Sequence, residues 1–326
     1  MRVDVSEIKT FKGCKRQWQL SSRNQFHLKP KAPQPQLLLG TLFHEALAQM
    51  YLGVSLDKVM EMVKKEMDPT VDNALLAMVP GYYKNVLPED LDRFHVLDVE
   101  HHFEIAPTLS DGTLLFPEQD DPSKSRLTVC GSIDLVVIDT FTNEIFGFEH
   151  KTCKDFRPET YMWMDEQPRV YTWALKTYVQ NYNAKRAAEY EKAWQEWAAL
   201  GGYKESEPAR PAEVTLGGVY MNEVKKLLRQ FKHKRTLCTY TDQDLDNFML
   251  TFFSHCAHCE DYVRTGAFPA PDPNYMTCRM CSFQDLCMTY MYNNLNKDLI
   301  LQEFVEEFEE RTEDHLEEKA ERSTQK

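Results

Sequence analysis

Asp134, Glu149 and Lys151 are the residues of this chain whose types and spacing best suit catalysis. They lie at the ends of two apolar runs rich in β-branched side chains, and turn-forming residues over 139–143 separate the runs. This pattern predicts a β-hairpin that brings the three side chains together. Because Glu149 and Lys151 are two residues apart on a strand, we expect them to point to the same face.

Two carboxylates that converge on one point repel each other unless a cation or a proton compensates them. A Mg²⁺ ion, held by one or two carboxylates, water and a substrate phosphate, would compensate Asp134 and Glu149 and is suited to cleaving phosphodiesters. Lys151 would then hold the attacking water and stabilise charge on phosphorus. An ordinary amphipathic hairpin with one exposed salt bridge is the alternative that this triplet alone leaves open.

A G-x-x-D motif ending at Asp134 precedes an E-x-K motif ending at Lys151. This arrangement resembles the PD-(D/E)XK nuclease superfamily, and within it the RecB-like branch that includes the RecB and AddB nuclease domains and the CRISPR-associated RecB-like exonucleases. Similar segments extend from about Ser6 to Cys287. The resemblance implies an α/β, restriction-endonuclease-like core, in which a central mixed β-sheet is flanked by helices, and hydrolysis of DNA with Mg²⁺ or Mn²⁺, as an exonuclease on single strands or ends.

The resemblance also implies the other site residues. His44, on a helix expected over 37–65, matches a third ligand to the catalytic ion; by itself it would be a packed or surface imidazole. Gln167 and Tyr171, on a helix expected over 155–183, match a Q-x-x-x-Y motif beside the active site and the DNA backbone. The expected catalytic residues are Asp134, Glu149, Lys151, Gln167 and Tyr171, and the expected metal ligands are His44, Asp134 and Glu149.

The nine cysteines allow two alternative metal sites, which share Cys278 and Cys281. A C-x₂-C pair at Cys256 and a second one at Cys278 have the spacing of a zinc site. The first pair, however, lies in an apolar helical stretch without the turn of a zinc knuckle. The alternative resembles the [4Fe–4S] ligands of AddB and its CRISPR-associated relatives, and four thiolates suit either metal. The expected cofactor-binding residues are Cys14, Cys278, Cys281 and Cys287, which would clasp the N- and C-terminal segments together.

The net charge of −13 argues against a protein that coats nucleic acid, because affinity for phosphate comes from clustered Lys and Arg. DNA would have to bind a local groove, and the basic residues between 225 and 235 are either part of it or a solvated face. No P-loop motif is present, so unwinding would need a helicase or recombination partner. Without a membrane span or secretory signal in the sequence, we expect a cytoplasmic or otherwise intracellular protein with no membrane partner.

We expect one nuclease domain over 1–303, with a helical and linker elaboration over 184–212, and an acidic tail over 304–326. Alternation and apolar runs predict strands over 96–107, 126–138, 144–151 and 214–221. Further helices are expected over 5–22 and 242–264. The rival function is a non-catalytic DNA-binding or scaffold subunit that keeps an iron–sulfur or zinc site.

Overall fold

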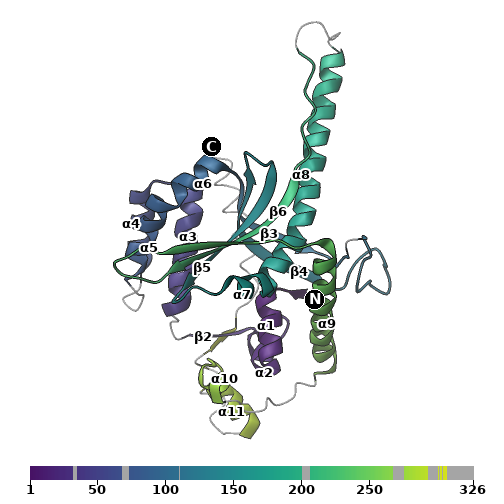
Figure 1. Cartoon of the computed structure of the whole chain (residues 1–326). Coiled ribbons are helices and arrows are strands. Elements are labelled where there is room, and N and C mark those ends of the chain that lie inside the picture. The colour runs from purple at the N-terminus through teal and green to yellow at the C-terminus, as the bar shows by residue number, and fades with distance from the viewer. Residues whose placement is uncertain are drawn as a thin grey trace. The chain divides into compact units, whose positions relative to one another are not determined.

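The computed structural model describes residues 1–31, 35–67, 73–109, 111–199, 206–266, 275–292, 300, 302 and 304–306 (Figure 1). The chain forms two compact units: a core unit, Gln34–Leu250, and a terminal unit, Met1–Pro33 with Thr251–Lys326. The candidate catalytic residues belong to the core unit, and the four candidate cluster cysteines to the terminal unit. The division into a domain over 1–303 and a tail stays a prediction, and residues 307–326 of that tail lie outside the described residues.

The core unit is built on a mixed sheet with strand order β3-β4-β5-β6-β7. Only β5 and β6 of these neighbours are parallel, and the other pairs are antiparallel. The α/β fold with a central mixed sheet is therefore confirmed. The strands are β3 (Phe94–Ile105), β4 (Thr128–Asp139), β5 (Glu144–Cys153), β6 (Thr215–Lys225) and β7 (His233–Cys238).

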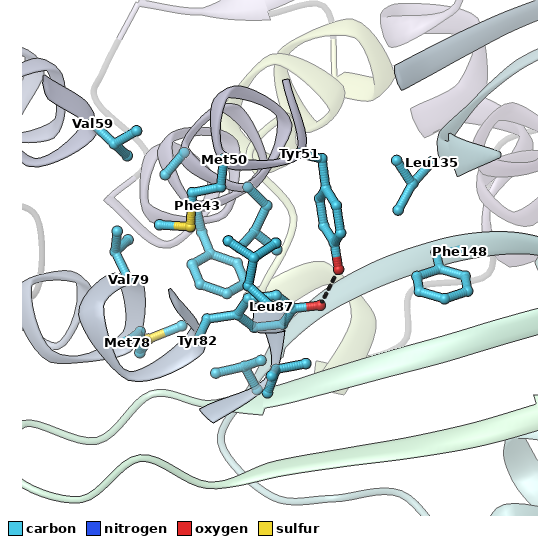
Figure 2. Close-up of a cluster of buried hydrophobic side chains, with 14 of the residues drawn as sticks. Phe43, Met50, Tyr51, Val59, Met78, Val79, Tyr82, Leu87, Leu135 and Phe148 are labelled. Atoms are coloured by element: carbon cyan, nitrogen blue, oxygen red, sulfur yellow. Dashed lines mark hydrogen bonds between the residues drawn. The ribbon is translucent and has the colours of Figure 1, made fainter. Parts of the chain in front are cut away.

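Helices cover both faces of this sheet, which gives three layers (Figure 1). On one face, Leu135 and Phe148 join the apolar cluster drawn in Figure 2, together with side chains of the first four helices of the core unit. The opposite face carries Gly147, where a Cβ atom would come within 2.8 Å of Leu175 on the long helix α8. The four helices are α3 (Pro35–Tyr51), α4 (Leu56–Glu66), α5 (Leu75–Asn85) and α6 (Leu87–Arg93).

The β4–β5 hairpin forms where the sequence predicts it, because Asp139 organises the turn. One oxygen of this buried carboxylate accepts hydrogen bonds from the backbone N of Phe141 (2.9 Å) and Thr142 (3.2 Å). The other accepts from Nε of Arg93 at 2.7 Å. Asn143 closes the turn with a φ of 59°, a conformation that Asn tolerates better than most residues. The turn fixes the register of the hairpin, and thereby the positions of the polar residues at its other end.

Two predicted helices of the core unit are each broken in two. The expected helix over 37–65 ends at Tyr51, where Gly53 adopts a φ of 83° after the last turn, and α4 starts beyond it. The expected helix over 155–183 is α7 (Glu159–Met164) followed by α8 (Glu166–Ala199). Asp165 separates them and accepts a hydrogen bond from the backbone N of Gln167 at 3.0 Å. Beyond 183, α8 continues without interruption into the segment that was expected to be an elaboration, of which 200–205 lie outside the described residues.

The terminal unit contains helices from both ends of the chain. The expected helix over 5–22 is interrupted at Cys14, whose backbone is extended, and in this unit the Phe11 ring packs edge-on against Tyr262 at 5.5 Å. No helix in the described part of the chain has the length and apolarity needed to cross a membrane. The elements not yet given are β1 (Arg2–Val3), α1 (Val5–Gly13), α2 (Lys15–Ser21), β2 (Leu28–Pro30), α9 (Asp242–Thr265, which includes the unit boundary), α10 (Tyr275–Arg279), α11 (Gln284–Tyr292) and β8 (Phe304–Glu306), which pairs with β2.

Candidate active site

The open end of the β4–β5 hairpin brings the predicted catalytic residues together. Leu135 pairs with Phe148, so Asp134 and Glu149 are the next residues along the two strands. The ammonium group of Lys151 contacts Oε1 of Glu149, which confirms that the two side chains share a face. His44 reaches Asp134 from α3, with 3.1 Å between Nδ1 and Oδ1.

Gln167 and Tyr171 join this group from the first turns of α8. The Gln167 amide donates through Nε2 to Oε1 of Glu149 at 2.8 Å and to the hydroxyl of Tyr171 at 2.9 Å. The i, i+4 spacing places both side chains on one face of α8, as the sequence predicts. Direct contacts therefore join His44 to Asp134, and join Lys151, Gln167 and Tyr171 around Glu149. The charges of Asp134 and Glu149 act on each other across the hairpin.

Glu149 carries most of the electrostatic cost of this arrangement. Its side chain is buried, with the residue only 3% exposed, and its Oε2 atom has no hydrogen-bond partner among the described residues. Burial and the nearby charge of Asp134 raise the pKa of Glu149 to about 7. A buried carboxylate oxygen without a partner is the feature that a hard cation would satisfy.

The pKa values of Asp134 and Lys151, beside Glu149, are shifted in opposite directions. Burial would raise the pKa of Asp134, but His44 and a 2.7 Å hydrogen bond from the backbone N of His150 lower it. Burial would lower the pKa of Lys151, but the charges of Glu149 and Asp134 raise it. Lys151 is therefore a cation here, suited to stabilising negative charge rather than to accepting a proton.

The residues present fit a divalent ion, provided that the ion displaces some of their present hydrogen-bond partners. Within the described ranges, no three side chains of His, Cys, Asp and Glu stand as a ready set of ligands for one ion. Both oxygens of Asp134 and one of Glu149 already accept hydrogen bonds, from His44, the His150 backbone, Lys151 and Gln167. Oε2 of Glu149, which has no partner among the described residues, is thus the natural first ligand. An ion would replace His44 as the partner of Oδ1 of Asp134, or Lys151 as the partner of Oε1 of Glu149. Carboxylate oxygens with one imidazole suit Mg²⁺ or Mn²⁺.

Three residues that the sequence did not single out hold the segment between β5 and α8. The fully buried Glu223 is the β6 neighbour of Lys151 in the sheet and accepts from Nε of Arg157 at 3.1 Å. The same guanidinium contacts Asp165 at 3.2 Å. A charged residue within the apolar β6 pattern, beside a catalytic strand, was the available signal for this support.

A buried polar network lies behind the catalytic strand, on the face of β5 opposite Glu149. Its centre is Asn222, whose Oδ1 accepts from Nε of Arg235 at 2.6 Å and from Nε2 of His233 at 3.2 Å. Because these donors fix the amide, Nδ2 donates to Nδ1 of His150 at 3.2 Å and to the hydroxyl of Tyr82 at 3.2 Å. His150 therefore carries its proton on Nε2, and burial lowers its pKa to about 3.

Arg235 connects this network to Asp90. Its guanidinium makes two hydrogen bonds to the buried carboxylate, at 2.6 and 2.8 Å. Asp90 also accepts at 2.6 Å from Tyr51, which is hydrogen-bonded to Tyr82 in Figure 2. Among the basic residues between 225 and 235, Arg235 therefore forms a structural ion pair with Asp90 and is not a phosphate contact. Lys234 is also engaged, since it donates to the backbone O of Arg157 at 3.0 Å.

The four candidate cluster cysteines are all half-buried. Cys14 lies between α1 and α2, Cys278 on α10, Cys281 between α10 and α11, and Cys287 on α11. Burial, and then the charges of the other three thiolates, raise the pKa of Cys287, although nearby Arg16 opposes this. The described residues do not form a ligand set for a single ion. Cys256 and Cys259, the other half of the zinc alternative, are fully buried on α9, as expected from its apolar pattern.

Comparison with known families identifies the superfamily of this chain. The sequence pattern of the PD-(D/E)XK nuclease superfamily matches residues 2–288. No curated protein matches the chain. A solved structure titled "Crystal structure of SSO0001" aligns with 77% of this chain and 94% of its own, at 10% identity and a TM-score of 0.30, a likeness too weak to inform the fold. The superfamily match spans the whole hairpin, the helix that carries His44 and the start of α8, and the chain therefore belongs to the PD-(D/E)XK nuclease superfamily.

Proposed function

We propose that this chain is a Mg²⁺- or Mn²⁺-dependent deoxyribonuclease that acts on single strands or DNA ends. The observation that carries the proposal is the unpartnered, buried Oε2 of Glu149 at the point where Asp134, Lys151 and Gln167 converge. An amphipathic hairpin with an exposed salt bridge would not bury such an atom, because its desolvation is left uncompensated.

Each side chain has a separate part in the hydrolysis. Asp134 and Glu149 would hold the ion, with His44 as the third ligand. A bound ion would supply Lewis-acid stabilisation of the phosphate and a more acidic water. Lys151 orients the attacking water and stabilises the charge that develops on the phosphate oxygens as the P–O bond to the leaving sugar breaks. Gln167 keeps Glu149 in position and, with Tyr171, faces the substrate backbone.

The decisive experiment is a cleavage assay with purified protein, Mg²⁺ or Mn²⁺, and linear, circular, single-stranded and double-stranded DNA, with RNA as a comparison. We expect cleavage of single-stranded or linear DNA. Asp134→Ala and Lys151→Ala should each reduce it by at least 100-fold while the far-UV circular dichroism spectrum stays unchanged. Asp134→Ala should also weaken Mg²⁺ binding, measured by calorimetry.

The assay also separates the rival function. A scaffold subunit would bind DNA without cleaving it in any metal, and the two variants would then behave like the wild type. Full activity in either folded variant would contradict the catalytic roles. Glu189→Gln, a substitution of an exposed acid on α8, is the matched control and should cleave like the wild type.

We further propose that Cys14, Cys278, Cys281 and Cys287 ligate a structural [4Fe–4S] cluster. Two observations support this: the exposure of the four cysteines is intermediate, and Cys14 interrupts its helix.

A further inference from the structure

The short helix α7 exposes large apolar side chains beside the catalytic residues. Tyr161 is 70% exposed, Met164 65% and Trp163 41%, whereas Met162 is fully buried and anchors the helix. Tyr161 and Met164 are three residues apart and share one face of the helix. Exposed aromatic side chains that gather at one place usually mark a surface that binds something.

The contacts at both ends of α7 fix this surface relative to the active site. Arg157, just before the helix, is bonded to Glu223 on the strand beside Lys151, and also to Asp165, just after the helix. Asp165 in turn accepts from the backbone of Gln167, whose side chain holds Glu149. Arg157 therefore ties the start of α7 to the strand beside Lys151, and Asp165 ties its end to Gln167, whose amide contacts Glu149, so α7 lies close to the catalytic carboxylate.

The Trp163 ring is held rigidly while part of it stays open. Its Nε1 donates to the backbone O of Thr239 at 2.9 Å, and its ring packs at 5.3 Å against Tyr240 with a tilt of 33°. The guanidinium of Arg169 lies 5.8 Å from the Trp163 ring and 5.7 Å from that of Tyr240. An aromatic ring that is already ordered, with a cation beside it, loses little entropy when a flat ligand stacks on it.

We propose that Tyr161, Trp163 and Met164 form a stacking surface for unpaired bases of the strand that is bound at the catalytic site. This inference rests on the proposed nuclease function and adds the reason for a preference for single strands. Bases in a duplex are paired and stacked on each other, so they cannot reach the rings, whereas an unpaired base presents its face to any aromatic side chain. The phosphates of the same strand would meet Lys151.

The test measures binding without cleavage, using the full chain in EDTA and a short fluorescein-labelled oligodeoxynucleotide in single-stranded or duplex form. Tyr161→Ala should raise the Kd for the single strand by roughly 5- to 100-fold, the effect of losing one stacked base, and leave the duplex Kd unchanged. Tyr161→Phe keeps the ring and should bind like the wild type. With 2-aminopurine in the single strand, quenching on binding should be smaller for Tyr161→Ala.

Phe141→Ala is the matched control, because Phe141 is 79% exposed but lies in the hairpin turn at the far end of β5. It should leave both affinities unchanged. The inference is overturned if Tyr161→Ala binds single strands like the wild type, or loses duplex and single-strand affinity equally. A dimer in size-exclusion chromatography that Tyr161→Ala converts to monomer would also overturn it. If the wild type cleaves nothing, it is the proposed function that fails, which the cleavage assay shows separately.

Discussion

Glu149 combines two demands that conflict without an ion. It must be ionised to bind a cation, yet it is buried next to Asp134, and these two effects raise its pKa to about 7. A carboxylate with a pKa above its unfolded value of about 4.5 favours the protonated folded form. The contribution of this proton to stability is complete below about pH 4.5 and is lost as the pH rises through about 7.

We therefore expect Glu149→Gln to stabilise the metal-free protein at pH 8, by up to about 3 kcal/mol, since each pKa unit is worth about 1.4 kcal/mol. The difference should vanish at about pH 4.5. Urea unfolding in EDTA at both pH values measures it. Adding Mg²⁺ at pH 8 should stabilise the wild type and not the variant. A wild type as stable as Glu149→Gln at pH 8 in EDTA would show that burial and Asp134 do not raise the pKa of Glu149.

At the scale of elements, β7 is a strand that the sequence did not predict, because its first residues are charged. Its residues His233, Lys234 and Arg235 continue a basic run, which suggested either a groove for phosphates or a solvated face. In the structure the strand alternates, so that Arg235 turns inward to the buried Asp90. The basic run is therefore divided between structural and exposed residues.

Replacing Arg235 by Ala should lower the free energy of unfolding by about 3–5 kcal/mol, because Asp90 would be left as a buried charge without its partner. Lys232→Ala, at an exposed position of the same run, should change it by less than about 0.5 kcal/mol. Chemical denaturation of both variants measures the difference. If Lys232 contacts phosphate, its variant should reduce the slope of log K against log salt by about one unit, whereas a purely solvated Lys232 leaves that slope unchanged.

The sequence predicts the elements whose signals are local and misses those that depend on distant partners. The hairpin and the mixed sheet are confirmed, since alternation and turn residues lie within short segments. The structure places His44 3.1 Å from Asp134, a proximity that only the family resemblance implied, and their roles as metal ligands stay a prediction. The break at Gly53 could have been read from its glycine. The link from Asn222 to His150 could not, because it joins residues whose proximity arises only from the parallel pairing of β5 with β6.

At the scale of the whole molecule, single cysteine replacements distinguish the iron–sulfur assignment from the zinc alternative. We expect anaerobically purified protein to be brown and to contain about four irons per chain. Cys14→Ala and Cys287→Ala should remove colour and iron and lower the thermal midpoint, because the long loop that the cluster closes becomes free.

Cys256→Ala and Cys259→Ala are the controls for this experiment. They trim fully buried small side chains on α9, so they should cost stability but retain iron. Metal analysis together with the visible absorption spectrum gives the answer. One zinc per colourless chain, lost with Cys256 and kept without Cys14, would establish the zinc alternative instead.

The composition of the terminal unit from both ends of the chain has a consequence for biosynthesis. Phe11, which packs against Tyr262, leaves the ribosome about 250 residues before its partner, a wait of roughly 10–50 s at usual elongation rates. During that time the core unit, a continuous segment, can fold while the first helices keep their apolar side chains without their final partners. The nascent N-terminal helices therefore expose apolar side chains that a chaperone would cover until α9 has been made.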